Sequence, residues 1–185
     1  MRNFLFLLCT ILILSSSNAF ASAPHDGMNM SHDMTEPLKN LSGKDFEAAF
    51  YSMMIPHHQA AVGMSEKILE STQDPEVEKW AKSIIEAQSK EIDFMQKALE
   101  NVGGLRENLY LSMEADMAEM LSKTQTDKDF VELMIPHHES AIKMAELVKD
   151  RTKTPEILAL AHSILTTQQE EIDEFRTWLM VNKAD

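Results

Sequence analysis

Cysteine is almost absent from this chain: the single thiol, Cys9, lies in an apolar run close to the N-terminus. Glycine and proline are also scarce, at five and six residues, and aromatic residues make up only 6%. Proteins built from many short strands and tight turns use these residues heavily, whereas Leu, Ala, Met, Glu and Lys are strong helix formers. The composition therefore predicts an all-α domain that has no disulfide bond.

Positive charge is the next scarcity. The sequence has 17 Lys and Arg against 30 Asp and Glu, a net charge of −13 at pH 7. Such a surface repels nucleic acid and anionic lipid, so neither is an expected partner. Long hydrophobic runs are missing as well: the run from Phe4 to Leu14 is shorter than the roughly 20 residues that a membrane helix needs. We therefore expect no membrane insertion of the mature chain.

The N-terminus contains the three parts of a secretory signal peptide. Basic Arg2 precedes the apolar run, and Ala19-Phe20-Ala21 supplies the small residues of a cleavage site. We expect residues 1–21 to be removed and the mature protein to be periplasmic or otherwise exported. Loss of Arg2 leaves 16 basic residues against 30 acidic ones, a net charge of −14.

Residues 22–40 are expected to form a flexible tail, because they lack apolar periodicity and contain prolines and a glycine. Methionine usually fills gaps in a hydrophobic core, but a tail has no core to fill. Imidazole and thioether groups bind soft metal ions, which favours metal capture. The tail holds five candidate metal ligands: His25, Met28, Met30, His32 and Met34.

The chain is organised around a stretch that occurs twice. Met-Ile-Pro-His-His begins at Met54 and recurs at Met134, 80 residues later. The same offset aligns further identical pairs: Ala61 with Ala141, Met64 with Met144, Glu66 with Glu146, Pro75 with Pro155, Gln88 with Gln168 and Glu91 with Glu171. This duplication predicts helical-hairpin units at residues 41–103 and 127–183. A linker with a short helix, residues 104–126, would join them into one bundle domain.

The first helix of each unit carries the repeated motif. Helical spacing places the candidate ligands on one inward stripe in each unit: Met54, His57, His58 and Met64, then Met134, His137, His138 and Met144. Pro56 has no N–H to donate to the carbonyl of Ser52, so we expect it to kink the helix.

The second helix of each unit interrupts its apolar stripe with two polar residues. These are Gln88 and Glu91 in unit one, and Gln168 and Glu171 in unit two. Buried polar groups need partners, and metal-ligating histidines commonly donate their second N–H to such an acceptor. We interpret the four residues as hydrogen-bond partners of the metal-ligating histidines, which would not contact the metal themselves. A structural polar pair at a helix crossing is the alternative.

The linker carries its own stripe, which includes Met113, Met117 and Met120. Methionines at helical spacing usually pack, so we interpret this segment as a covering helix rather than as a methionine relay for metal.

The donor set favours copper over other metals. Thioether and imidazole suit copper(I), whereas zinc usually recruits thiolate or carboxylate and iron a set of carboxylates. We therefore expect copper, with Cu(I) favoured over Cu(II), and silver shares these ligands. The structural alternative is a core in which methionines pack and histidines cap the kink at Pro56. Export, the absence of cysteine and the repetition in register favour metal.

At these residues the chain resembles domain-of-unknown-function family 305, whose members include CopM-like periplasmic copper-binding proteins. The matching pattern continues from the motif through Ala61, Met64, Gln88, Glu91, Ile92 and Met95. The resemblance covers residues 45–99 and 125–179. It implies a ferritin-like four-helix bundle that sequesters or carries copper and contributes to copper resistance or homeostasis. The implied ligands are Met54, His57, His58, Met64, Met95, Met134, His137, His138 and Met144, and Phe175 stands where unit one has Met95.

Two other functions are compatible with a helical bundle. A ferritin-like metal-dependent oxidase needs Glu-x-x-His pairs on two helices, and the sequence contains none, so we do not expect an enzyme. A module that docks a basic partner on its acidic face without metal is the other alternative. For a copper protein, the candidate partners are copper ions and a copper export pump or periplasmic copper carrier.

Overall fold

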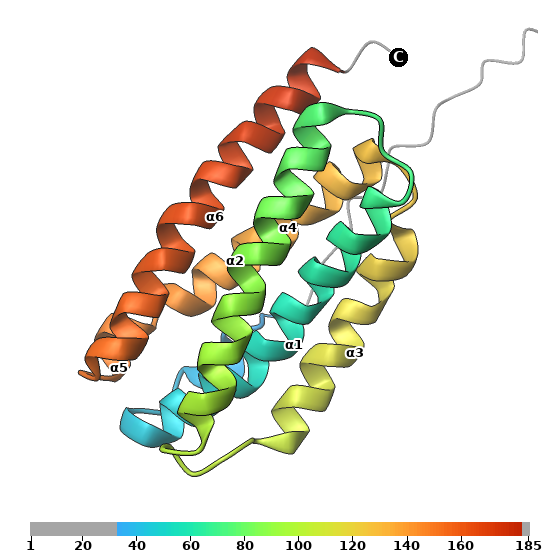
Figure 1. Ribbon diagram of the computed structural model, residues 1–185. Coiled ribbons are helices and arrows are strands. Elements are labelled where there is room, and N and C mark those ends of the chain that lie inside the picture. The colour runs from blue at the N-terminus through green and yellow to red at the C-terminus, as the bar shows by residue number, and fades with distance from the viewer. Residues whose placement is uncertain (1–32, 183–185) are drawn as a thin grey trace, which may run out of the picture.

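The computed structural model describes residues 33–182, and all regular elements in this range are helices (Figure 1). A short 3₁₀ helix, Glu36–Leu38, comes first. The α-helices are α1 Gly43–Leu69, α2 Pro75–Leu99, α3 Glu107–Lys123, α4 Asp127–Glu146, α5 Val148–Arg151 and α6 Pro155–Val181. The prediction of an all-α fold is confirmed for the described residues.

Helix α1 lies at the centre of the molecule and packs against α2, α3 and α4. Every residue from Phe46 to His58 is buried, as expected for a helix that is covered on all sides. The helix runs through Pro56 without dividing. Just before this position, the hydroxyl of Ser52 donates to the carbonyl of Ala48 and accepts from the backbone N–H of Arg106. This hydroxyl ties the middle of α1 to the start of α3.

Helices α2 and α6 pair with α1 and α4 respectively. The carboxylate of Asp74 caps α2 by accepting from the backbone N–H groups of Glu76 and Val77. Proline occupies the first turn of both helices, where its missing N–H costs nothing. Trp80 of α2 meets Phe175 of α6 edge to face, with ring centroids 5.1 Å apart. The aromatic contact joins the two hairpins on the side away from α3.

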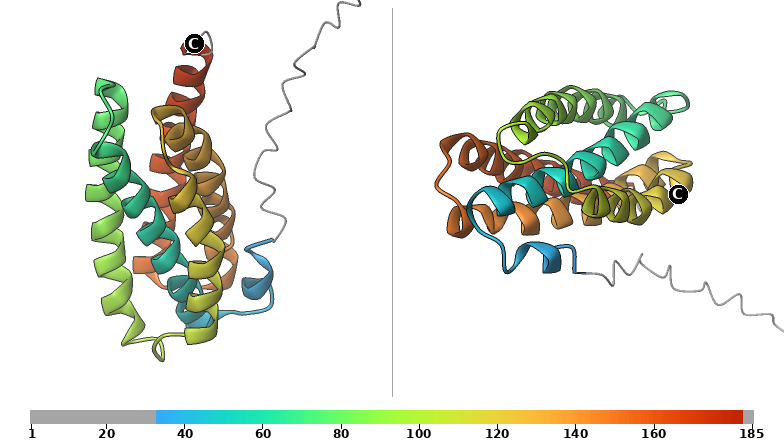
Figure 2. Two further views of the ribbon diagram at one scale, coloured as in Figure 1. Left: turned by 90° about the vertical axis from the view of Figure 1, so that its right-hand side faces the viewer. Right: turned by 90° about the horizontal axis from the view of Figure 1, so that it is seen from below.

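Helix α3 lies along α1 (Figure 2). Gly103 and Gly104 precede it with φ of 97° and 82°, a backbone conformation that favours glycine. The side chains of Met113, Met117 and Met120 are buried beneath the helix. These contacts match the interpretation of the segment as a covering helix.

The two halves of the duplication differ in their first helices. Helix α4 begins with a capping box between Thr126 and Asp129 and ends at Glu146, whereas α1 continues to Leu69, the position that aligns with Lys149. The short α5 fills the difference. Thr154 occupies the N-cap of α6 but does not cap it; its hydroxyl donates to Glu47 of α1 instead.

Residues 33–39, the last part of the predicted tail, pack against the helical bundle. The side chain of Leu38 is 0% exposed and that of Met34 is 6% exposed, and both belong to the hydrophobic core. Leu38 belongs to the 3₁₀ helix that packs against α1, and Met34 lies in the turn just before this helix. Met34 therefore packs in the core and is not a free tail ligand. The signal peptide and the rest of the tail lie outside the described residues.

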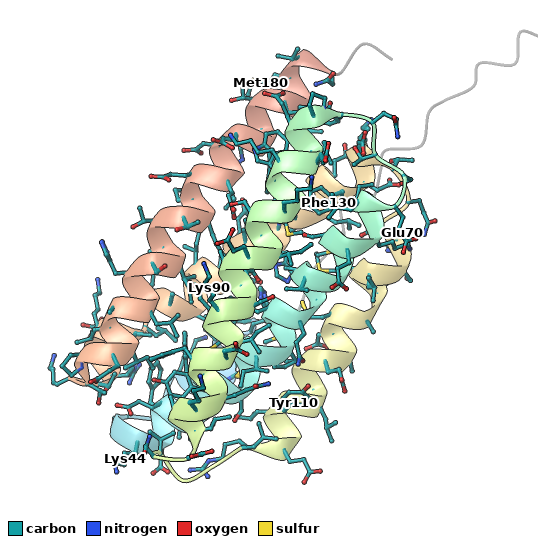
Figure 3. All side chains as sticks on the ribbon, viewed as in Figure 1. Lys44, Glu70, Lys90, Tyr110, Phe130 and Met180 are labelled. Carbon is teal, nitrogen blue, oxygen red and sulfur yellow. The ribbon has the colours of Figure 1, made fainter. Side chains whose placement is uncertain are left out.

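Charged side chains cover the outer faces of the helices. Lys44, Glu70 and Lys90 are all exposed (Figure 3). Between residues 33 and 182, no helix combines the length and apolar character needed to cross a membrane.

Candidate metal centre

The crossing of α1 and α4 brings the two histidine pairs into one row. The rings of His57 and His137 stack with centroids 3.8 Å apart. His58 continues the row at 6.1 Å from His57, and His138 at 5.8 Å from His137. All four side chains are 0% exposed. Two motifs separated by 80 residues thus form a single buried centre, whereas the sequence indicated only one face in each unit.

The two outer imidazoles of this row lie against carboxylates. His58 Nε2 donates to Glu91 Oε2 over 2.7 Å. His138 Nε2 lies 2.7 Å from Glu171 Oε2, but the geometry is out of line for a hydrogen bond. The structure therefore places both predicted glutamates beside an imidazole, and only the first makes the hydrogen bond.

One of the two inner imidazoles, that of His57, is held by Ser140, a residue that sequence reasoning missed. His137 Nε2 donates to the backbone carbonyl of His57 over 2.9 Å. Ser140 Oγ donates to the carbonyl of His137, so its lone pair accepts from His57 Nε2 at 2.7 Å. Ser140 aligns with Ala60 in the repeat. This departure from the repeat, one turn after a histidine, was the signal that could have identified it.

These contacts determine which ring nitrogen carries the proton. Because a carboxylate, a hydroxyl lone pair and a carbonyl all accept, His57, His58 and His137 carry hydrogen on Nε2. The Nδ1 atoms of all four histidines are buried without a hydrogen-bond partner. An unpartnered buried polar atom costs about 1–3 kcal/mol. The four unpartnered Nδ1 atoms are candidate ligand atoms for a metal ion.

Burial favours the neutral form of three of the four imidazoles, those of His57, His137 and His138. Loss of hydration lowers the pKa of His57 and His137 well below the usual 6.5, and the neighbouring imidazoles lower it further. The same cause lowers the pKa of His138 to about 3. Metal ligation needs neutral imidazole, so these side chains are already in the state that binds.

Glu171 shows the opposite shift. Burial raises its pKa to about 7, with added repulsion from the carboxylates of Glu174 and Glu91. Near neutral pH this residue exchanges a proton beside His138.

The thioethers predicted as ligands are buried in the same core. The side chains of Met54, Met64, Met95, Met134 and Met144 are 0% exposed. Phe175, the counterpart of Met95, lies with its ring centroid 5.8 Å from that of His138. Within residues 33–182, no three His, Cys, Asp or Glu side chains converge as a metal site. A site here would therefore have to combine imidazole with thioether. His25, Met28, Met30 and His32 lie outside the described residues.

A small cavity of about 10 Å³ lies between α2 and α6, next to the histidine row. Its lining consists of aligned pairs: Ile84 and Ile164, Ala87 and Thr167, Gln88 and Gln168, Glu91 and Glu171. Because equivalent residues face each other here and at the stacked histidines, a pseudo-two-fold axis relates the hairpins. The side-chain nitrogen and oxygen of Gln88 and the side-chain oxygen of Gln168 have no hydrogen-bond partner. The predicted hydrogen bonds from these atoms to the imidazoles are therefore not formed in the described structure. The cavity has about the volume that one water molecule needs.

The fold and this centre define a class: all-α proteins made of a duplicated helical hairpin, with buried imidazoles where the halves cross. The chain belongs to the family described as Domain of unknown function (DUF305), whose model matches residues 15–99 and 107–179.

Solved structures of this family resemble the chain. CopM in its Cu(II)-bound form is 30% identical with a TM-score of 0.65, and the match covers 73% of this chain and 96% of CopM. CopM in its Cu(I)-bound form is 31% identical with a TM-score of 0.61, over 73% and 96% of the two chains. A secreted DUF305 protein from Streptomyces coelicolor has the same fold, with a TM-score of 0.63 at 24% identity over 75% and 94%.

Among curated proteins, uncharacterized protein L153 of Acanthamoeba polyphaga mimivirus is 45% identical over 53 residues. The match covers 29% of this chain and 35% of L153, so the chain spans about a third of that relative.

Proposed function

We propose that this protein binds copper ions as cargo at the buried histidine row and does not act on them as an enzyme. The observation that carries the proposal is the set of four buried Nδ1 atoms that have no partner in the protein. Neutral imidazole nitrogen and thioether sulfur are the ligands that copper(I) prefers. We therefore infer that the candidate ligands on α1, α2 and α4 favour Cu(I) over Cu(II). Silver would bind to the same ligands.

The comparisons support a role in metal handling. CopM has been solved with Cu(I), with Cu(II) and with silver bound. At 30–31% identity these structures make copper the first metal to test for this chain. The secreted relative supports export of this protein, and we propose the periplasm as its compartment. Sequestration or carriage of copper there would contribute to copper resistance, with an export pump or copper carrier as partner.

We further propose that α1, α2, α4 and α6 form a ferritin-like four-helix bundle, with α3 as an added cover on α1. The oxidase that this architecture could host is disfavoured, because the chain has no Glu-x-x-His pair. Glu91 instead accepts the hydrogen bond of His58 Nε2, and Glu171 lies beside His138 Nε2.

The direct test is removal of the four imidazoles. A variant with Ala at His57, His58, His137 and His138 should lose most of its copper(I) in a competition titration with a moderate chelator, while far-UV circular dichroism stays helical. His162→Ala is the matched control, because this exposed histidine lies outside the row. Full copper stoichiometry in a helical quadruple variant would show that the row is not the site.

A second set of variants tests the same proposal with substitutions that are less prone to unfold the protein. Leu is close to Met in volume and is well tolerated in cores. Leu at Met54, Met64, Met134 and Met144 should keep the fold and weaken copper(I) binding, whereas Leu at Met113, Met117 and Met120 of α3 should not. Equal effects of the two sets would mean that the thioethers on α1 and α4 serve only as packing.

A further inference from the structure

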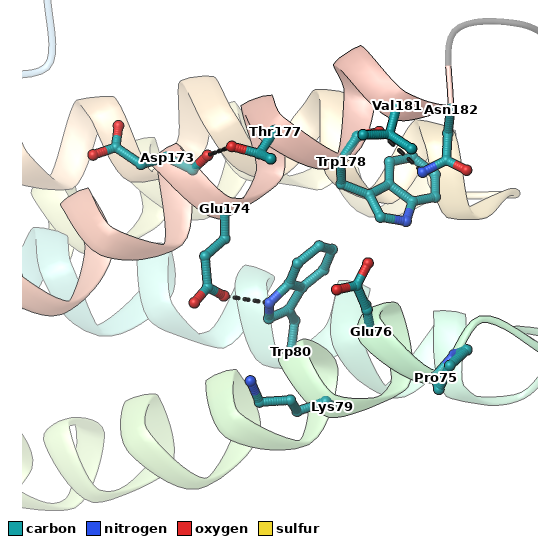
Figure 4. Close-up of a pocket in the computed structure, with 10 residues that line it drawn as sticks. All are labelled: Pro75, Glu76, Lys79, Trp80, Asp173, Glu174, Thr177, Trp178, Val181 and Asn182. Atoms are coloured by element: carbon teal, nitrogen blue, oxygen red, sulfur yellow. Dashed lines mark hydrogen bonds between the residues drawn. The ribbon is translucent and has the colours of Figure 1, made fainter.

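A groove of about 580 Å³ separates the start of α2 from the end of α6, outside the histidine row (Figure 4). Its two walls are the first turns of α2 and the last turns of α6. Trp80, Trp178 and Val181 provide its apolar surface, and Glu76, Asp173 and Glu174 provide its carboxylates. A hollow of this size with a few charged groups is typical of small-molecule sites.

The two indoles in the groove are fixed in place by carboxylates. The indole N–H of Trp80 donates to Glu174, and that of Trp178 donates to Asp74 over 2.9 Å. Both rings are mostly buried, with 6% and 8% of their side chains exposed. They form a rigid floor, and their remaining exposed parts face the groove. Val181, at 74% exposure, extends the apolar surface to the rim.

Negative charge dominates this floor. Glu76 lies between the two indoles (Figure 4) and makes no ion pair or side-chain hydrogen bond. Glu174 and Asp173 approach from α6, and Lys79 is the one cation of the lining. No ion pair joins Lys79 to these three carboxylates. The groove therefore combines an aromatic floor with carboxylates that have no cationic partner in the described structure.

The opposite end of the molecule provides an internal comparison. There a groove of about 400 Å³ separates the end of α2 from the start of α6, and the pseudo-two-fold axis relates it to the first. Lys97 lines that groove in the last turn of α2. A cation there interacts favourably with the negative end of the helix dipole. The aligned residue of α6 is Thr177, and the last turn of α6 has no basic residue. Among residues 33–182, helix α2 supplies a cation at its end of the molecule and α6 supplies none at the aligned position.

We propose that the groove between α2 and α6 binds a small organic cation with an apolar body, such as a protonated aryl- or alkylamine. The ammonium group sits by Glu76 and Glu174 and the end of α6, and the apolar body lies on the indole floor and Val181. A cation near an indole gains further from the electrons of the ring. The site shares no residue with the histidine row.

The two tryptophans make the proposal directly measurable, because they are the only ones in the chain. Phenylethylammonium, titrated into metal-free protein with a chelator present, should shift tryptophan emission along a saturable curve. Its uncharged counterpart, 2-phenylethanol, should bind at least tenfold more weakly.

Matched variants test where the cation sits. Thr177→Lys supplies the missing cation and should weaken binding of phenylethylammonium at least tenfold, and Glu76→Gln should weaken it severalfold. Lys97→Thr and Glu156→Gln make the corresponding changes at the opposite end and should leave binding unchanged. A curve that does not saturate, equal binding of the alcohol, or equal effects at both ends would overturn the proposal. So would binding of a lysine peptide, acetyl-Phe-Lys-amide, without binding of the free amine, which would assign the groove to a protein partner.

Discussion

The two histidine–glutamate pairs have the same sequence relationship and different environments. In the first half, Glu91 accepts from His58 and its other oxygen accepts from Ser163 of α6 at 3.2 Å. In the second half, Glu171 only approaches His138, and burial raises its pKa to about 7. Ser83, the counterpart of Ser163, makes no such bond to Glu171. Equivalent residues therefore occupy unequal sites.

The difference comes from the neighbours rather than from the motif. Glu174 adds a second carboxylate near Glu171, where unit one has Phe94. Phe175 packs by His138, where unit one has Met95. A duplicated set of residues can thus diverge through substitutions three or four positions away, which makes the two halves of the centre unlike.

Acidification should produce the largest effect, because the buried histidines and Glu171 change the stability of the fold in opposite directions as the pH falls. Below pH 6.5 the unfolded chain protonates its histidines, but His57, His137 and His138 stay neutral when folded, so stability falls as the pH falls. Glu171 opposes this between its usual 4.5 and about 7, because the folded state then holds an extra proton. The net of two protons corresponds to roughly 2.7 kcal/mol lost per pH unit between pH 6.5 and 4.5.

Urea unfolding at several pH values measures this slope. Replacing His138 by Asn should lower the difference in bound protons between the unfolded and folded states from two to one. The slope should therefore be halved, whatever the substitution does to stability at pH 7. A stability that stays flat from pH 6.5 to 4.5 would contradict neutral buried imidazoles.

The two glutamates should respond in opposite directions to neutralisation. At pH 8, Glu91→Gln disturbs the bonds to His58 and Ser163 and should lower the free energy of unfolding by about 1–3 kcal/mol. Glu171→Gln removes a buried charge whose raised pKa makes it unfavourable, so this variant should be neutral or more stable at pH 8. Its advantage should shrink below pH 7 and disappear near pH 4.5. Paired denaturation curves decide this, and equal losses from both variants would mean that the halves are equivalent.

Exchanging Met95 and Phe175 should reverse the preference of the halves for copper(I). A thioether can ligate a soft ion and a phenyl ring cannot, so the half that contains Met95 should bind more tightly, by about tenfold or 1.4 kcal/mol. In the double variant Met95→Phe and Phe175→Met, the tighter half should be the second. Copper(I) titrations of proteins with one histidine pair left in each background measure the ranking. An unchanged ranking would assign Met95 to packing alone.

The tail next to the first half should have the smallest effect on the folded domain. Removal of residues 22–32 takes away His25, Met28, Met30 and His32, so it should reduce the number of copper ions bound while the thermal midpoint stays within about a degree. Removal of residues 22–39 also deletes buried Leu38, at 0% exposure, and should lower the midpoint by several degrees. Unchanged copper stoichiometry after the shorter deletion would show that the tail does not capture metal.

Much of the helical order could be predicted from local signals. Prolines at positions 75 and 155, the acidic cap at Asp74 and the apolar stripes place α2 and α6 correctly. The break after α4 and the packing of residues 33–39 were missed, because each depends on which surface a short segment meets and not on its own composition.

By itself, the sequence determined the helices, the duplication and the identity of the repeated donors, because these follow from periodicity and residue chemistry within a few turns of chain. Only the tertiary structure decided that His57 stacks on His137 and that Ser140 fixes a tautomer. It also decided that the Nδ1 atoms remain unpartnered and that Glu171 differs from Glu91. Those properties depend on burial and on contacts between residues far apart in the sequence, such as His57 with Ser140 and Glu91 with Ser163, which exist only after the two hairpins have packed.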